Sequence, residues 1–471
     1  MKVMKKILFI VYALLIFMPS LPMAEAGDTF SPPKKSPGEG NGTKDASVFT
    51  GPAQGTAVPG GLTLRAYVSE VLQVNPDIKS MQAQVAASAA KYHYTGVIPD
   101  PTLMLKINNM DSRYSVGSDP MSYFGIELDQ MVPFPVKLHL ESEIAFKELR
   151  ISRQELRQKE LEVQSKAVAA FSDYYCNDES LLLLEQYLKI IDMVIRTARQ
   201  RYETGIASQQ DLLRAILERS RLEERIDIIG FELKRSTARM NGLLAKTPDT
   251  LLPGPAGMQA AGIGYDKDSL YGSAESTSPA IAMANSRVEE NKLELSRSKW
   301  SYAPDLEFGA GLMTRGSYPP GWTGSIGISL PLYFWTKQRY MVKGAGAGLD
   351  AAKQNQNNTE KTTLAEIDAS YKEAQTEYSL INLYKNEIVP QAALTFSSAI
   401  SSYITGRVDF VTTMDALLIL IDYRQMLYQR TADYFKALAR LSVLSGVDLI
   451  KADAPTAPSG RPSSRGGKTG D

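Results

Sequence analysis

Several features that restrict protein function are scarce or missing in this chain. Cys176 is the only cysteine among 471 residues, so the chain cannot form an internal disulfide. Basic and acidic side chains balance at 52 each, whereas nucleic-acid-binding proteins usually carry a basic excess. The two histidines, His93 and His139, lie far apart and lack the spacing of zinc ligands. We therefore expect no nucleic-acid partner and no metal site.

Residue sets that carry out catalysis are missing as well. No combination of Ser, His and Asp, or of Cys and His, is convincing as a nucleophile with its base. The glycine-rich run at residues 344–348 lacks the Lys-Ser/Thr pair of a phosphate-binding loop. The sequence thus predicts a protein that is not an enzyme and that uses no cofactor.

Only one long apolar run is present, near the N-terminus. Lysines at positions 2, 5 and 6 precede the apolar residues 7–17, and Ala24-Glu25-Ala26 fits a signal-peptidase site. This pattern predicts a signal peptide over residues 1–26. An N-terminal membrane anchor is the alternative, although such an anchor needs about 20 apolar residues. Because no later run is long enough, any further membrane span must come from strands in a closed β-barrel.

Two segments have a composition that is unsuited to burying a core. Residues 27–61 and 449–471 are rich in Gly, Pro, Ser and Thr, which predicts a flexible leader and a disordered tail. We expect the folded part of the chain to lie between them.

The folded part shows an internal duplication. Tyr202-Glu203-Thr204-Gly205 recurs 201 positions later as Tyr403-Ile404-Thr405-Gly406, and other landmarks repeat at nearly the same offset. Self-similarity at one offset indicates a repeated structural unit. We predict a first repeat at residues 62–246, a linker at 247–275 and a second repeat at 276–448.

Each repeat is predicted to contain a helix, two strands, a long helix and a return helix. In the first repeat, helices are expected at residues 64–94, 137–202 and 209–242, with strands at 102–107 and 122–131. In the second, helices are expected at 280–300, 338–403 and 410–444, with strands at 305–313 and 323–332. The first long helix carries apolar residues at the heptad spacing of a coiled coil: Leu184, Leu188, Ile191, Ile195, Ala198 and Tyr202.

The strands have the length and alternation of membrane-spanning strands, but four of them cannot enclose a pore. Their open edges need partners, so several chains must contribute to one barrel. Three chains would supply twelve strands and a tube of twelve helices. Four aromatic residues flank strands, as an interfacial belt would, with a plain core role as the alternative: Trp322, Tyr333, Phe334 and Trp335.

At this point the sequence resembles a known family. The duplicated layout, the two Tyr-x-x-Gly turns and the start Asn75-Pro76-Asp77-Ile78 are together similar to the TolC-type outer-membrane efflux proteins. The run at residues 132–137 is similar to the branch that serves heavy-metal RND pumps, although Val136-Lys137 stands where that branch usually has Gly-Lys.

The resemblance implies a mainly α fold with a small β part. Duplicated helical hairpins would form a trimeric α-barrel, and four strands per chain would contribute to a shared twelve-stranded transmembrane β-barrel. The homotrimer would lie in the outer-membrane lipid with a periplasmic helical extension. It would passively conduct small molecules or metal ions from an inner-membrane RND-type pump and a periplasmic adaptor protein.

The resemblance also points to a periplasmic gate beyond the helix-turn tips at Gly205 and Gly406. Asp415 lies nine residues after Gly406, where the family places an inward-facing aspartate ring. Thr412 occupies the place of a companion aspartate. Asp211 and Tyr403 correspond to a hydrogen-bonded pair that helps to hold the closed state.

Each gate residue has an ordinary alternative. Asp415 could be a solvated residue on a helix surface, and Asp211 could be a first-turn acid that the helix dipole favours. The basic partner expected two residues after the second glycine is Val408 here, which leaves Arg407 as a substitute.

A different function remains open from the sequence alone. The long helical hairpins would also suit a soluble periplasmic coiled-coil adaptor or scaffold protein. Such a protein has no use for two hairpins of membrane-spanning length that end in aromatic residues, and this favours the channel.

Overall fold

The computed structural model describes residues 61–109, 121–205 and 208–450. The predicted signal peptide, nearly all of the predicted leader and most of the predicted tail lie outside these residues. None of the described helices combines the length and the apolarity needed to cross a lipid bilayer.

The first half begins with two helices, α2 (Leu64–Val74) and α3 (Pro76–Tyr94). They meet at Asn75, whose side chain accepts a hydrogen bond from the backbone N–H of Asp77 at 3.0 Å. Pro76 occupies the first position of α3, where a missing N–H costs nothing. The segment predicted as a helix at residues 64–94 is thus two helices, with Pro76 in the first turn of the second.

A very long helix and its return helix complete the first half. Helix α4 spans Pro135–Glu203 and α5 spans Gln209–Leu243. Ser208 caps α5, because its side chain accepts a hydrogen bond from the N–H of Asp211. The heptad positions pack as a seam: Leu184, Ile191 and Ala198 are fully buried.

The second half repeats this order with one interruption. Helices α7 (Pro279–Trp300), α8 (Gln338–Leu383), α9 (Val389–Ile404) and α10 (Phe410–Ser445) follow one another. A π-helical turn, Tyr384–Ile388, separates α8 from α9 where a single helix was predicted. Pro390 explains the difference, because proline lacks an N–H and clashes with the carbonyl group of the preceding turn.

The segment predicted as a linker contains part of a helix. Helix α6 spans Lys267–Thr277, and Asp266 caps it by accepting a hydrogen bond from Ser269 N at 3.0 Å. Leu270 and Ala274 are fully buried in a small core cluster with residues of α8 and α10. The apolar contacts of these two side chains therefore give the end of the linker a fixed place on the second half.

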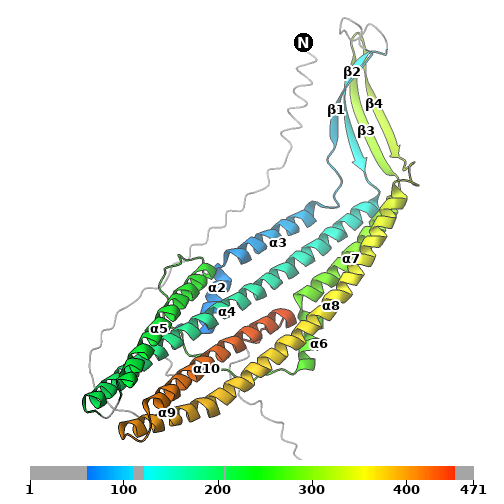
Figure 1. The fold of residues 1–471 in the computed structure, drawn as a ribbon. Coiled ribbons are helices and arrows are strands. Elements are labelled where there is room, and N and C mark those ends of the chain that lie inside the picture. The colour runs from blue at the N-terminus through cyan, green and yellow to red at the C-terminus, as the bar shows by residue number, and fades with distance from the viewer. Residues whose placement is uncertain (1–60, 110–120, 206–207, 451–471) are drawn as a thin grey trace, which may run out of the picture. The chain divides into compact units, whose positions relative to one another are not determined.

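The four strands form one antiparallel sheet in the order β1-β2-β3-β4 (Figure 1). They span Thr102–Asn108, Tyr123–Val132, Asp305–Arg315 and Tyr318–Ser329. Strand β2 of the first half pairs with β3 of the second, so the sheet joins the two repeats. The second hairpin is tighter than predicted, because β4 already begins two residues after Gly316, whose φ of +64° suits a tight turn.

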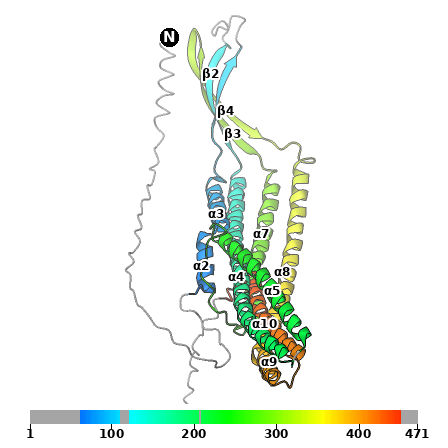
Figure 2. The same cartoon turned by 60° about the vertical axis from the view of Figure 1, so that its left-hand side comes forward.

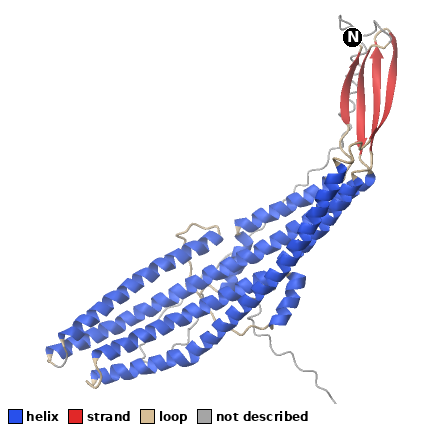
Figure 3. Cartoon of the chain, turned by 45° about the vertical axis from the view of Figure 1, so that its right-hand side comes forward, coloured by secondary structure: helices blue, strands red, loops and turns tan. Residues whose placement is uncertain are grey.

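The helices lie side by side, with the sheet beyond one end of them (Figures 1 and 3). Near the sheet the lateral order is α3, α4, α7, α8 (Figure 2). Farther away it is α5, α4, α10, α8, with α9 continuing α8 beside α10 (Figure 1). Large apolar clusters fill the spaces between these helices, and residues of α4 and α10 contribute to both of the largest.

Candidate functional site

The sheet has two chemically different faces. Successive residues of a strand point to opposite faces, and the strand register shows which residues share a face. One row across the four strands reads Leu105, Ile126, Leu312 and Trp322. The adjacent row, on the opposite face, reads Met104, Glu127, Gly311 and Thr323. We call these the apolar face and the polar face of the sheet.

The four predicted belt residues are not in the core of the chain. Trp322 is 78% exposed on the apolar face, and Tyr333, Phe334 and Trp335 are more than half exposed just after β4. Phe334 and Trp335 contact each other edge to face, with 4.9 Å between ring centroids. The alternative of a plain core role is therefore wrong for this chain, and the interfacial belt stays a prediction.

The two hairpin tips have the same local construction. Gly205 after α4 and Gly406 after α9 have φ values of +73° and +77°, which glycine adopts without strain. The next helices are capped by Ser208 and Asp409, whose side chains each accept a hydrogen bond from the N–H three residues later. The repeat therefore extends from the sequence to the capping of the helices at this end.

Tyr403 is the most deeply buried of the predicted gate residues, at 2% exposure. Its ring packs edge to face against Phe410, with centroids 5.9 Å apart. The guanidinium group of Arg201 lies over the same ring, 4.9 Å from its centroid, and Arg201 Nη1 donates a hydrogen bond to the Tyr403 carbonyl oxygen. Arg201 thus connects the end of α4 to the end of α9.

The expected hydrogen bond between Asp211 and Tyr403 is not formed. The Tyr403 hydroxyl group is buried and has no hydrogen-bond partner among the described residues. Burial raises the pKa of this hydroxyl; the charge of Arg201 opposes the rise and the charge of Asp211 adds to it. Asp211 is therefore near enough to act through its charge, while Arg201 makes the direct contact.

Asp415 lies on α10 with a half-exposed side chain, and Thr412 is exposed one turn earlier. The Asp415 carboxylate is 3.7 Å from Nη2 of Arg214 on α5. Arg214 precedes Asp415 by the repeat offset of 201 residues, so equivalent positions of the two halves face each other. Arg407, the suggested substitute, is exposed and makes no ion pair among the described residues.

Sequence reasoning missed both arginines that act at the tips. Arg201 stands one residue before the Tyr-x-x-Gly turn, and Arg214 stands at the repeat-equivalent position of Asp415. Comparing the charges of aligned repeat positions would have shown the second of these. The first depends on how the ends of α4 and α9 come together, which the sequence does not specify.

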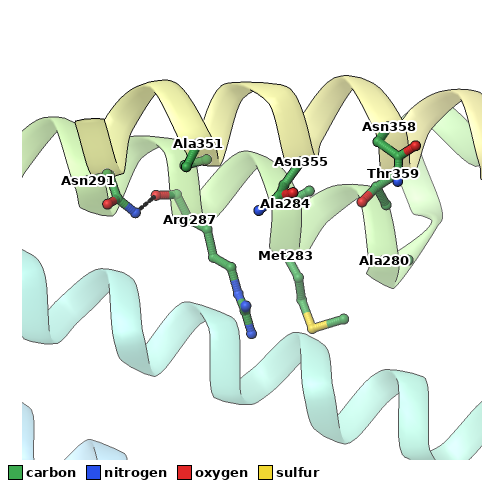
Figure 4. A pocket seen from close by; sticks show the side chains of 11 residues that line it. Ala280, Met283, Ala284, Arg287, Asn291, Ala351, Asn355, Asn358 and Thr359 are labelled. Carbon is green, nitrogen blue, oxygen red and sulfur yellow. Dashed lines mark hydrogen bonds between the residues drawn. The ribbon is translucent and has the colours of Figure 1, made fainter. Parts of the chain in front are cut away.

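A hollow of about 500 Å³ lies between α7 and α8 (Figure 4). Alanines, amide side chains and Met283 line it, and the Arg287 side chain extends toward α4, where its guanidinium is 3.9 Å from Glu155. Arg287 is the one titratable side chain among the residues that line the hollow. Within the described part of the chain, no group of three or more His, Cys, Asp or Glu could hold a metal ion.

Comparison with known proteins gives a consistent family. Residues 67–241 and 270–447 match the model of the outer membrane efflux protein family. The outer membrane efflux protein BepC of Brucella suis biovar 1 (strain 1330) is 20% identical over 336 residues, which cover 70% of this chain and 72% of BepC.

Solved structures agree on the fold. The outer membrane protein VceC of Vibrio cholerae has a TM-score of 0.69 at 17% identity, covering 82% of this chain and 96% of VceC. The open state of the outer membrane channel MtrE of Neisseria gonorrhoeae has a TM-score of 0.68 at 11% identity, covering 82% of this chain and 89% of MtrE.

The duplicated helical hairpins and the two-faced sheet are thus the fold of outer-membrane efflux channels. The chain belongs to the outer membrane efflux protein family, because the family model matches most of its length. It is an efflux channel of the outer membrane whose helices extend into the periplasm, as the resemblance implied. The alternative of a soluble periplasmic scaffold is therefore abandoned.

Proposed function

We propose that three copies of this chain form the channel. The observation that carries this proposal is that the sheet, the helices near it and the helices farther from it each have two open edges. First-half elements β1, α3 and α5 form one edge, and second-half elements β4, α8 and α9 form the other. Unlike edges that meet head to tail close into a ring when the rotation allows it. Such a ring would close the sheet and leave no strand edge unpaired.

The channel would act as the outer part of a tripartite system. The chain has no motif for nucleotide binding or catalysis, so transport through it is passive and needs an external source of energy. We propose an inner-membrane RND-type pump as that source and a periplasmic adaptor as the connection. The hairpin tips at Gly205 and Gly406 form the end of the helices away from the sheet, where an adaptor would bind (Figure 1).

The hairpin tips would also hold the gate. In a trimer, three copies of Asp415 approach one axis, where like charges repel and a cation is attracted. Arg201 would hold the closed state, because it fastens the end of α4 to the end of α9 through Tyr403. Opening would require the two helical hairpins of a chain to separate at this contact.

The experiment is single-channel recording from the purified protein in planar bilayers. Asp415→Ala is expected to raise the conductance about twofold and to weaken block by divalent cations, because it removes the convergent charges. Arg201→Met keeps the length of the side chain but loses its contacts, and is expected to raise the fraction of time spent open.

Asp422→Ala is the matched control for Asp415. Asp422 lies two turns along the same helix, is similarly exposed and also pairs with an arginine of α5, Arg225, at 2.7 Å. It should change neither conductance nor divalent block. If Asp415→Ala changes conductance and divalent block as little as this control does, Asp415 is an ordinary surface residue and the gate assignment is wrong.

A further inference from the structure

The polar face of the sheet carries a set of acidic residues that the gate does not use. Across the middle of the sheet this face bears Glu127 and Asp129 of β2 and Glu307 of β3, with Lys106 of β1 as the one basic residue among them. The apolar face bears no charged residue over the same rows. Each chain therefore places an excess of negative charge on one face of its sheet.

Glu127 is buried and fully engaged. It is 5% exposed, and its Oε1 lies 2.6 Å from Nζ of Lys106. The hydroxyl groups of Thr323 and Ser325 on β4 each donate to it at 3.4 Å. This carboxylate reaches across β3 to contact β4, so it is fixed in place and its charge is largely balanced by Lys106.

Asp129 differs from Glu127 because it forms no ion pair among the described residues. Its side chain is 7% exposed, and its Oδ2 has no hydrogen-bond partner among the described residues. A buried carboxylate oxygen without a partner is costly unless water or a cation reaches it. The Asp129 carboxylate lies on the polar face of the sheet, and no basic side chain of the described residues lies within ion-pair distance of it.

Glycines make room for these acids. A Cβ on Gly309, which pairs with Asp129 in the register, would lie 2.3 Å from both Asp129 Oδ1 and Ser325 Oγ. A Cβ on Gly311, which pairs with Glu127, would lie 2.7 Å from Thr323 Oγ1. Any larger residue at these two positions would displace the acids or the hydroxyl groups, so the carboxylates are built into the sheet.

We propose that Glu127 and Asp129, with Glu307, form an acidic band that makes the membrane part of the conduit prefer cations over anions. This inference rests on the proposed closed trimer, in which the apolar face meets lipid and the polar face surrounds water. Three chains then bring their excess negative charge together in a narrow passage of low-dielectric walls, which focuses the field on passing ions. The band is separate from Asp415, which lies at the far end of the helices.

The test is the reversal potential of the trimeric protein in planar bilayers under a gradient of potassium chloride. Asp129→Asn keeps the shape of the side chain and is expected to lower the cation-over-anion permeability ratio about twofold. Lys106→Gln removes the balancing charge and is expected to raise the same ratio. The double variant Lys106→Gln with Glu127→Gln leaves the net charge of the band unchanged, and its ratio should stay near that of the wild type.

Each variant should be measured in the wild-type and in the Asp415→Ala background, so that the tip does not mask the band. Opposite shifts for Asp129→Asn and Lys106→Gln support the proposal. Unchanged ratios in channels of normal conductance would overturn the acidic band and leave the channel function intact. If the wild-type protein forms no trimeric channel, the proposed assembly is wrong, and so is the proposal of an acidic band, which depends on that assembly.

Discussion

At the scale of single residues, glycines with positive φ decide where helices end. Gly205 and Gly446 have nearly equal φ values, +73° and +74°, but their surroundings differ. A Cβ on Gly446 would lie 2.2 Å from the carbonyl oxygen of Thr277, at the junction of α6 and α7. A Cβ on Gly205 would meet no atom of the described residues within 4 Å. Gly205 is therefore required only by its backbone conformation, whereas Gly446 is required both by its backbone conformation and by the close approach of Thr277.

We therefore expect Gly446→Ala to destabilise the protein far more than Gly205→Ala. The left-handed conformation alone costs a residue with a Cβ about 1 kcal/mol. Gly446→Ala must also push the Thr277 backbone away from α10, for a total of about 3 kcal/mol. Thermal unfolding followed by circular dichroism would measure both variants. Equal losses of stability in the two variants would show that the close contact of Gly446 with the α6–α7 junction does not add to the cost of the substitution.

The thiol of Cys176 gives a second prediction at this scale. The side chain is buried in α4, and burial raises the pKa of the thiol to about 11. Because the thiolate is the reactive form, a raised pKa leaves almost none of it at pH 8. Labelling by iodoacetamide should be very slow in the folded protein and fast in denaturant. Fast labelling of the folded protein would contradict the burial of this site.

At the scale of elements, the two faces of the sheet are set by alternation within each strand. In β1, Leu105 points to the apolar face and is 68% exposed, while Met104 points to the polar face and is 40% exposed. These two adjacent residues have side chains of similar size, and both side chains are accessible in the single chain. Their environments would differ only in the assembled channel, where one face of the sheet would meet lipid and the other water.

This contrast predicts unequal effects of an introduced charge. Leu105→Arg would place a cation against lipid, at a cost of about 2–4 kcal/mol if the position lies near the middle of the bilayer. Met104→Arg would place it in the water-filled passage and is expected to leave assembly unchanged. The amount of folded protein in the outer-membrane fraction measures the difference. A reversed order would mean that the faces are assigned the wrong way round.

At the scale of the whole molecule, apolar side chains remain uncovered at the open edges. Leu394 of α9 is 71% exposed and Phe231 of α5 is 69% exposed, although each belongs to a helix of the coiled-coil part. Exposed apolar side chains on unpartnered helix faces indicate contact with another protein surface. A neighbouring copy in a head-to-tail ring is the occupant that the proposed function supplies.

We expect Leu394→Glu to weaken the trimer. Burying a leucine contributes about 2 kcal/mol, and a glutamate at the same place loses this contribution at each interface. Leu251→Glu is the control, because Leu251 is 94% exposed in the segment between α5 and α6, outside the helices and strands that form the two edges. Native mass spectrometry would report the number of chains. If both variants remain trimeric to the same dilution, Leu394 is not at an interface.

The sequence by itself determined the kind and order of the elements. Heptad spacing indicated the long helices, alternation indicated the strands, and the Tyr-x-x-Gly turns located the tips, because each of these signals depends on residues close together in the chain. Local signals also had limits: Pro390 lies inside an otherwise continuous helical pattern, and only the backbone showed how a π-helical turn accommodates it. The helical end of the linker was missed because Leu270 and Ala274 are buried by distant helices.

Tertiary structure alone decided which distant residues meet. That β2 pairs with β3, and that Asp129 therefore lies beside Gly309, follows from the register between two halves of the chain. The contact of Arg201 with Tyr403, which forms although the expected Asp211–Tyr403 bond does not, depends on how the ends of α4 and α9 come together. Such contacts arise from the summed packing of many side chains, which no short stretch of sequence encodes. The duplicated pattern fixed the elements of the channel, and their packing placed Glu127 and Asp129 on one face of the sheet.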